Sequence, residues 1–328
     1  MNVLSGIEEH SDPMNGTNLP PKASIIIAAK NADAFIAKAL RSALAQTMTD
    51  LEIIVIDDGS TDGTSEVVKA CANGDPRVQL LRNAHSQGVS SARNRAIAQA
   101  RGDWIAVLDA DDEFMPNRLE RMVGEATARD LDVLADNLAL RDFATNGPVR
   151  RAYPEDWMTQ SRLITLADLL ERDAPDLKHK NFGYIKPIMR RSFLTAHGLA
   201  YREDVWCAED FLLYAQSVIA GARFGVIDDM LYIYSERSGS ASSSGTAVHV
   251  EVARVNQLVG QLAHTSSPAE YRAIQMRQTR LDYFAFVQLF KNREFREAGR
   301  ILVRVPIGYV AKSATAAVIR RLHRLRAS

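Results

Sequence analysis

Cysteine is nearly absent from this chain of 328 residues, and neither charge sign is in excess. The two cysteines, Cys71 and Cys207, lie in unrelated contexts and offer neither a disulfide framework nor the spacing of metal ligands, which favours a reducing compartment such as the cytosol. Lys plus Arg and Asp plus Glu both number 40, so the chain as a whole has no basic field to attract nucleic acid. We therefore expect no nucleic-acid partner.

Signals for export or membrane insertion are also missing. Residues 1–21 are polar and carry acids where a signal peptide would be basic and then apolar, so we interpret them as a flexible leader. The most apolar late stretch, residues 301–319, is interrupted by Arg304, Pro306 and Lys312 and is a poor candidate for a membrane span of about 20 apolar residues. The seven histidines lack zinc-binding spacing, and no Gly-rich phosphate loop ending in Gly-Lys occurs.

From residue 23 the chain alternates short apolar runs with segments whose apolar residues recur at helical spacing. This alternation is typical of an α/β fold, with a mostly parallel sheet covered by helices on both faces. Asn31 or Asp33 is expected to cap the first helix. The pattern predicts strands over residues 24–28, 52–56, 78–81 and 104–108, and helices over residues 35–44, 64–72 and 91–100.

Acidic residues follow two of the predicted strands at the points where the strands end. Asp57 and Asp58 follow the second strand, and Asp109, Asp111 and Asp112 follow the fourth. Because parallel strands bind ligands at their carboxyl ends, these residues are expected to converge on one crevice. Carboxylates gathered in one place raise each other's pKa, so a bound cation would stabilise the group. Taken singly, each Asp is explained equally well by helix capping or turn formation.

Five ordered motifs resemble those of the family-2 inverting glycosyltransferases, which have the GT-A fold. They are Ser24-Ile25-Ile26-Ile27 with Asn31, Ile56-Asp57-Asp58-Gly59-Ser60-Thr61-Asp62, Gly88 with Ala92-Arg93-Asn94, Gly102-Asp103-Trp104-Ile105, and Leu108-Asp109-Ala110-Asp111-Asp112. The resemblance covers residues 23 to about 240. Within the family the chain is most similar to bacterial exopolysaccharide enzymes such as the succinoglycan glucosyltransferases.

The resemblance implies a donor site for a nucleotide sugar. It matches Asp58 to the family carboxylate that accepts a hydrogen bond from the uracil N–H of a UDP-sugar, and Asp109 to the residue near the ribose. Asp111 matches the acid of the Asp-x-Asp motif that holds Mn²⁺ or Mg²⁺, an ion that helps the nucleoside diphosphate to leave. Arg93 would supply a fixed positive charge to the pocket. The other donor-binding residues expected are Ala28, Lys30, Asn31, Ala110 and Arg237.

Two departures from the family pattern affect this donor site. Where the family usually has Pro-Thr-Tyr, residues 28–30 are Ala-Ala-Lys, so the aromatic ring and the hydroxyl that contact the base are missing. Lys30 is instead expected to stack the aliphatic part of its side chain on the base or to reach a phosphate. Where relatives often place a His that contacts metal or phosphate, this chain has Arg237, Ser238 and Ser240. We therefore expect Arg237 to contact the diphosphate, with loop closure over the donor.

The acceptor side is expected from residues 131–245, and the donor side from residues 22–130. Glu209 and Asp210 match the family's Glu-Asp motif at a helix start, so the resemblance makes Asp210 the general base and Glu209 a residue that orients it or binds acceptor hydroxyls. Stabilisation of the helix dipole, worth about 1 kcal/mol or less, would also explain the acidic pair.

Other motifs narrow the reaction type and the acceptor side. One base with one metal motif favours transfer over hydrolysis, which needs two facing carboxyls. The processive Gln-x-x-Arg-Trp motif is absent, which implies one sugar added per encounter. Trp157 and Trp206 are candidate aromatics for an acceptor sugar, whereas Trp104 is expected in the core.

Residues 246–328 fall outside the resemblance and are expected to form a helical, basic C-terminal extension. From residue 291 onward ten Lys or Arg accompany two Glu, a net charge of +8 that indicates an anionic partner surface. Residues 308–326 place an apolar stripe on one helical face, typical of an interfacial helix on a phospholipid leaflet; the stripe is Val310, Ala314, Val318, Leu322 and Leu325. A solvated basic tail or a subunit contact explains the pattern equally well.

The sequence thus predicts a cytoplasmic glycosyltransferase, peripheral on the inner face of the cell membrane, that moves one hexose from UDP-glucose to a growing, lipid-linked exopolysaccharide. A sugar nucleotidyltransferase is one alternative, but it would need a glycine-rich basic loop after the first strand, and residues 28–31 are not one. A non-catalytic polysaccharide-assembly or carbohydrate-binding subunit is another, and the presence of both Asp111 and Asp210 argues against it.

Overall fold

A single mixed sheet organises the chain in the computed structural model, which describes residues 20–145, 147–159, 162–174, 179–237, 246–263 and 267–311. Within these residues the strand order is β3-β2-β1-β4-β8-β6-β9-β5, with β7 paired to β6. The first half consists of parallel pairs and is formed by β1 (Ala23–Ala29), β2 (Leu51–Asp57), β3 (Val78–Arg82) and β4 (Trp104–Val107). The predicted α/β class and the four predicted strands are confirmed.

The second half of the sheet mixes parallel and antiparallel pairs. The long strand β6 (Val133–Asp142) pairs parallel with β9 (Phe224–Glu236) and antiparallel with β8 (Ile188–Arg190), which joins it to β4. The short strands β5 (Glu113–Phe114) and β7 (Arg150–Arg151) complete it. Because β8 bridges β4 and β6, the two halves of the sequence share one sheet.

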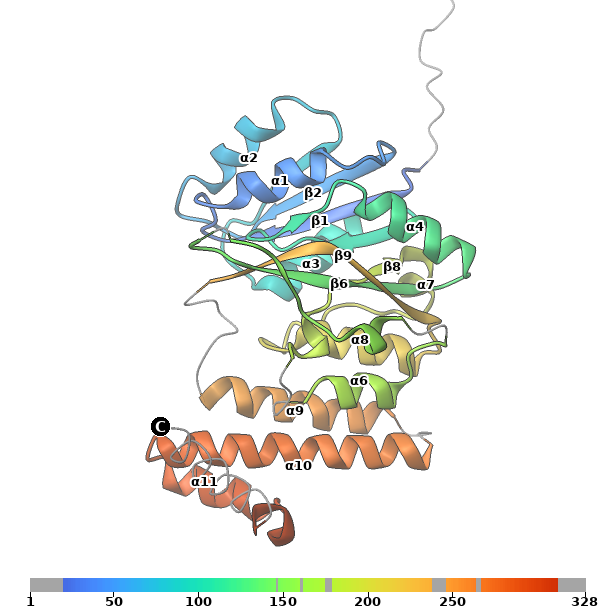
Figure 1. Ribbon diagram of the computed structural model, residues 1–328. Coiled ribbons are helices and arrows are strands. Elements are labelled where there is room, and N and C mark those ends of the chain that lie inside the picture. Colours follow the sequence, from blue (N-terminus) through green and yellow to red (C-terminus); the bar gives the residue numbers. More distant parts are fainter. Residues whose placement is uncertain are drawn as a thin grey trace, which may run out of the picture.

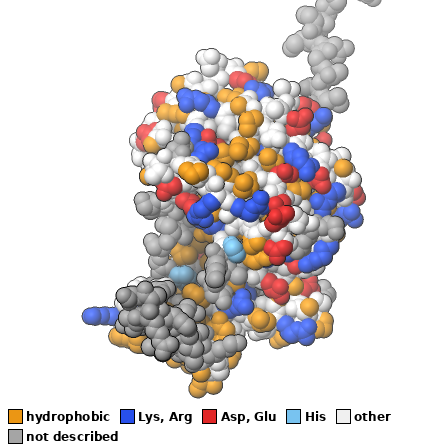
Figure 2. All heavy atoms as spheres, in the orientation of Figure 1, with side chains coloured by type: hydrophobic (Ala, Val, Ile, Leu, Met, Phe, Trp, Pro, Cys, Tyr) orange, Lys and Arg blue, Asp and Glu red, His pale blue; other side chains and the backbone are white. Residues whose placement is uncertain are grey.

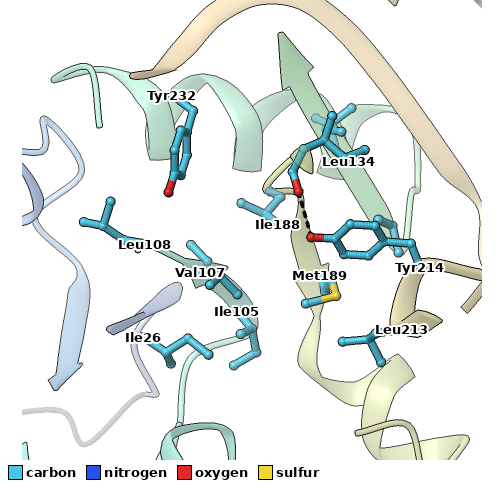
Figure 3. Packing of buried hydrophobic residues seen from close by; sticks show 14 of the residues in the cluster. Ile26, Ile105, Val107, Leu108, Leu134, Ile188, Met189, Leu213, Tyr214 and Tyr232 are labelled. Carbon is cyan, nitrogen blue, oxygen red and sulfur yellow. Dashed lines mark hydrogen bonds between the residues drawn. The ribbon is translucent and has the colours of Figure 1, made fainter. Parts of the chain in front are cut away.

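Helices cover the sheet. They are α1 (Ile36–Leu44), α2 (Thr64–Ala72), α3 (Val89–Gln99), α4 (Arg118–Ala128), α5 (Glu155–Met158), α6 (Leu166–Arg172), α7 (Arg191–Ala196) and α8 (Glu209–Ile219), with a 3₁₀ turn at Phe182–Tyr184. Of these, α1, α2 and α3 lie where the apolar spacing predicted them. In Figure 1, α1 and α2 lie on one side of the sheet and α6 and α8 on the other. Figure 3 shows Tyr214 of α8 and Tyr232 of β9 reaching the buried strands β4 and β8 from two sides.

The expected cap of α1 is wrong. The N-cap residue is Phe35, and no side chain caps this helix end. Asn31 adopts a positive φ of 49° earlier in the turn, and its Oδ1 accepts a hydrogen bond from the Thr61 N–H at 2.9 Å. Asn31 therefore ties the loop after β1 to the loop after β2.

Helices α9 (Thr246–Leu262), α10 (Pro268–Lys291) and α11 (Phe295–Leu302) follow the sheet. Figure 1 shows them stacked below α6 and α8. The buried Arg277 of α10 pairs with Asp173 Oδ1 at 2.7 Å, and its guanidinium lies 4.1 Å from the ring centroid of Phe211, the residue after Asp210. Helix α10 is thereby fixed against the start of α8.

The expected flexible leader lies outside the described residues up to residue 19, and the predicted interfacial helix lies outside them from residue 312 onward. In the part of the chain that is described, no helix has both the length and the apolar composition needed to cross a membrane.

Candidate active site

A cluster of five charged residues, of which Arg93, Lys186 and Asp210 are buried and Asp109 and Glu209 half-buried, joins the loop after β4 to the start of α8. Arg93 donates from Nη2 to Asp109 Oδ1 at 2.8 Å, and from Nη1 to Glu209 Oε1 at 2.9 Å and Asp210 Oδ1 at 3.0 Å. Lys186 Nζ lies 2.6 Å from Asp210 Oδ2 and 3.0 Å from Asp109 Oδ2. The two cations, each with only 4% of its side chain exposed, thus hold three carboxylates together.

Burial and charge pairing oppose each other in this charged cluster. Burial acts to lower the pKa of Lys186, but the adjacent carboxylates Asp109 and Asp210 outweigh it and raise that pKa. Burial acts to raise the pKa of Asp109, but Lys186 and Arg93 outweigh it and lower that pKa. Glu209 differs, because burial and the negative charge of Asp210 together raise its pKa. Glu209 is therefore the carboxylate of the cluster that the cations stabilise least.

The start of α8 presents its two acids to the cluster through an unusual turn. Ala208, directly before them, adopts a left-handed conformation with φ of 64°. Glu209 and Asp210 follow in the first turn, where the positive end of the helix dipole favours negative charge. The short, small side chain of Ala208 limits the steric cost of this conformation.

The other two acids of the loop after β4 have different partners. Asp111 Oδ2 lies 2.7 Å from Nε of Arg237, whose guanidinium stacks over the ring of Phe35. Asp112 accepts hydrogen bonds at 2.7 Å from the hydroxyl of Tyr232 and from a backbone N–H of β9. Burial and the neighbouring carboxylates raise the pKa of both acids. At Asp111 the positive charge of Arg237 opposes this rise but does not cancel it.

Residues 24–193, more than half of the chain, match the sequence family described as Glycosyl transferase family 2. The chain belongs to glycosyl transferase family 2. It is 35% identical to the succinoglycan biosynthesis protein ExoO of Rhizobium meliloti, over 87% of this chain and 77% of that one. It is 38% identical to ExoU of the same organism, over 71% of this chain and 67% of that one.

Solved glycosyltransferases share the fold of this family-2 chain. The structure of S. aureus TarS residues 1–349 in complex with UDP-GlcNAc aligns with a TM-score of 0.68 at 21% identity, covering 87% of this chain and 82% of that one. The mannosyltransferase PcManGT from Pyrobaculum calidifontis, in complex with GDP-Man and Mn²⁺, aligns with a TM-score of 0.57 at 19% identity, covering 92% and 81%. These likenesses confirm the expected GT-A type of fold.

Asp58 of this glycosyltransferase directly follows β2, where it was expected, and its carboxylate is hydrogen-bonded within the protein. Its two oxygens accept four hydrogen bonds at 2.7–2.9 Å, from Asn83, Ser86, Gln87 and Gly88. The carboxylate therefore has no lone pair left for a uracil N–H in this arrangement. The residues around it order the loop before α3.

Gly59 explains how closely that loop packs. Its φ is 67°, and a Cβ at this position would lie 2.7 Å from the backbone nitrogen of Ser86. Asp57 beside it is fully buried, accepts from Ser60 N–H at 2.8 Å and also bonds the Ser65 hydroxyl. Asp57 and Asp58 thus bind mainly hydrogen-bond donors, whereas Asp109 and Asp111 pair with cations.

The other predicted donor residues lie at different depths. Lys30 is exposed, Ala28 half-buried and Ala110 buried. The charged contacts that Arg93 makes are with the three carboxylates of the cluster, and its guanidinium also lies over the ring of Tyr201. Arg93 thus lies beside Asp109 of the predicted donor loop, and its role as a fixed positive charge of the nucleotide pocket stays a prediction.

The two candidate acceptor-side aromatics differ in their exposure to solvent. Trp206 has 54% of its surface exposed and lies three residues before Glu209. Trp157 instead packs among Tyr153 and Phe182. Trp104 is buried in β4, as expected.

Sequence reasoning missed Lys186 and Tyr232, which the structure places beside the acidic residues. Lys186 stands between Ile185 and Pro187 in an otherwise apolar run, and a lone charge in such a run signals a buried ion pair. The Tyr232 hydroxyl accepts from the Asp109 N–H at 3.1 Å while it donates to Asp112. No spacing rule marks Tyr232, because its partners lie more than 100 residues away in sequence.

Proposed function

We propose that this protein is an inverting, metal-dependent hexosyltransferase that moves a single glucose from UDP-glucose to a growing, lipid-linked exopolysaccharide. The observation that carries the proposal is the charged cluster, which holds the predicted base Asp210 beside Asp109 of the predicted donor loop. Residues 22–130 would bind the donor and residues 131–245 the acceptor. The succinoglycan names of ExoO and ExoU support the exopolysaccharide, and the UDP-GlcNAc complex of TarS supports a UDP-sugar.

Asp210 would act as the general base. The acceptor hydroxyl oxygen attacks the anomeric carbon, the bond from that carbon to the diphosphate oxygen breaks, and the hydroxyl proton passes to Asp210. Arg93 and Lys186 hold this carboxylate in place through ion pairs of 3.0 and 2.6 Å, and it would accept the proton as the new bond makes the hydroxyl acidic. Glu209, held by Arg93 alone within the cluster, would bind acceptor hydroxyls.

Asp111 fits the role of a ligand for Mn²⁺ or Mg²⁺. Its raised pKa shows a carboxylate that Arg237 compensates only in part, so a second positive charge would stabilise it. Among the described residues no group of three or more His, Cys, Asp and Glu could hold a metal by itself, which suits ions that take their remaining ligands from phosphate and water. When bound, the ion would neutralise charge on the departing diphosphate. Arg237 would contact the same diphosphate.

A panel of nucleotide sugars with Mn²⁺ or Mg²⁺ tests this function. We expect UDP-glucose to raise the melting temperature most and to be hydrolysed slowly in a metal-dependent way, because a ligand at 100 times its Kd stabilises the folded state by about 2.7 kcal/mol. A larger effect of a GDP- or dTDP-sugar would overturn the choice of base. No effect of any nucleotide sugar would favour the non-catalytic subunit.

Asp111→Asn is expected to abolish metal-dependent UDP binding, because the amide keeps the shape of the side chain but loses the charge that holds the cation. Isothermal titration with UDP, with and without Mn²⁺, measures the loss. Asp103→Asn makes the same chemical change at an exposed acid and should bind UDP like the wild type. Undiminished Mn²⁺-dependent binding in Asp111→Asn would remove Asp111 from the metal site.

Arg237→Gln is expected to strengthen Mn²⁺ binding in the absence of UDP by about fivefold, since a partly exposed ion pair of about 1 kcal/mol no longer competes for Asp111. Electron paramagnetic resonance of free Mn²⁺ measures this directly. Arg82→Gln removes a cation 3.7 Å from Asp57 and serves as the matched control. Equal Mn²⁺ affinity in wild type and Arg237→Gln would contradict the competition.

A further inference from the structure

Large apolar side chains are exposed on one short stretch of the C-terminal helices, residues 290–307, which we name the α11 surface. Val303 is 88% exposed, Ile307 89%, Phe295 58% and Phe290 56%. In Figure 2 hydrophobic side chains gather at the lower end of the molecule, where Figure 1 places α10 and α11. Contiguous apolar surface of this kind marks a site of interaction with a protein or a membrane.

The α11 surface is scarcely packed onto the rest of the protein. Between residues 291 and 308 only Ala298 and Val305 are buried. Helix α11 is joined to α10 by an aromatic row in which the ring of Phe290 lies 5.3 Å from that of Phe295. The row continues along α10 through Phe286 to Tyr283. Ring contacts therefore hold α11 against α10, but among the described residues no side chain of the core packs over the exposed apolar residues.

Positive charge accompanies this apolar surface. Residues 291–307 contain five Lys or Arg and two Glu. Arg296 and Arg300 lie one turn apart on α11, Arg304 follows the end of this helix, and all three are exposed. Long arginine side chains can bury their stems beside apolar groups while their charged ends reach phosphates. This arrangement is that of a helix lying in a membrane interface.

We infer that the α11 surface docks the enzyme on an anionic phospholipid leaflet. A second copy of the chain would bring the same arginines against each other in a two-fold contact, which like charges oppose. The segment that follows, residues 312–328, adds five Lys or Arg and no acid, so like charge also opposes its covering this surface. An anionic bilayer complements both the charge and the apolar side chains, and it would present the lipid-linked acceptor of the proposed function.

Sedimentation of the full chain with phosphatidylglycerol–phosphatidylcholine vesicles tests the inference without any substrate. The double variant Val303→Ser with Ile307→Ser should weaken binding roughly 10-fold or more, because burial of each side chain is lost. The triple variant Arg296→Gln, Arg300→Gln, Arg304→Gln should weaken it about fivefold per arginine and lower its sensitivity to salt. Phe143→Ser removes an apolar side chain that is 42% exposed outside this surface and should bind like the wild type.

Hydrolysis of UDP-glucose in solution separates this inference from the proposed function, because both surface variants should keep it at the wild-type rate. Vesicle binding unchanged by Val303→Ser with Ile307→Ser would overturn the inference. So would a wild-type protein that never sediments with anionic vesicles at low salt. A dimer in sedimentation equilibrium that this double variant dissociates, without vesicle binding, would assign the surface to contact between copies instead.

Discussion

Asp210→Asn is expected to lower turnover by roughly 10² to 10⁴-fold while the affinity for UDP-glucose stays nearly unchanged. The asparagine keeps the shape and one acceptor oxygen of the side chain, but it cannot take the proton of the acceptor hydroxyl. Arg93 and Lys186 still have Asp109 and Glu209 as partners, so the charged cluster remains neutralised. Steady-state turnover with an acceptor saccharide and titration of UDP measure the two effects separately.

Glu209→Gln is the matched control for this result. It changes the neighbouring acid in the same way, and a smaller loss of turnover with a weaker affinity for the acceptor is expected. If Asp210→Asn turns over like the wild type and Glu209→Gln does not, the base is Glu209. Its raised pKa would then be the feature that suits it to accept a proton.

Lys186→Met is expected to lower the free energy of unfolding by about 3–5 kcal/mol, the cost of removing one partner from a buried ion pair. Lys186 lies between Asp109 and Asp210, and without it Arg93 alone must compensate one buried and two half-buried carboxylates. Urea unfolding followed by circular dichroism measures the change. The substitution keeps most of the side-chain volume, so the lost charge accounts for the effect.

Lys38→Met provides the comparison for Lys186→Met, because Lys38 pairs with Glu113 at 2.8 Å while 48% of its side chain is exposed. An exposed pair contributes about 1 kcal/mol or less. Lys186→Arg should restore most of the stability, since it keeps the charge. Equal stability losses for Lys186→Met and Lys38→Met would show that the charged cluster does not stabilise the fold.

The sequence by itself determined the first half of the sheet, the helices that cover it and the family. These features depend on short-range patterns: apolar runs make β1, β2 and β4, and apolar residues at helical spacing make α1 and α2. The motifs around Asp58, Asp111 and Asp210 are likewise contiguous in the chain. Periodicity and local motifs are visible in one sequence because neighbours in the chain carry them.

Only the tertiary structure decided which partner each charged residue has. The sequence shows Asp58 at a strand end, but the loop that takes up all its hydrogen-bonding capacity lies 25–30 residues away. Lys186 joins Asp109 to Asp210 across 77 and 24 residues, and Val303 and Ile307, which follow α11, are exposed. Burial and ion pairing depend on which segments, distant in sequence, pack against each other. A pattern along the chain does not show which segments those are.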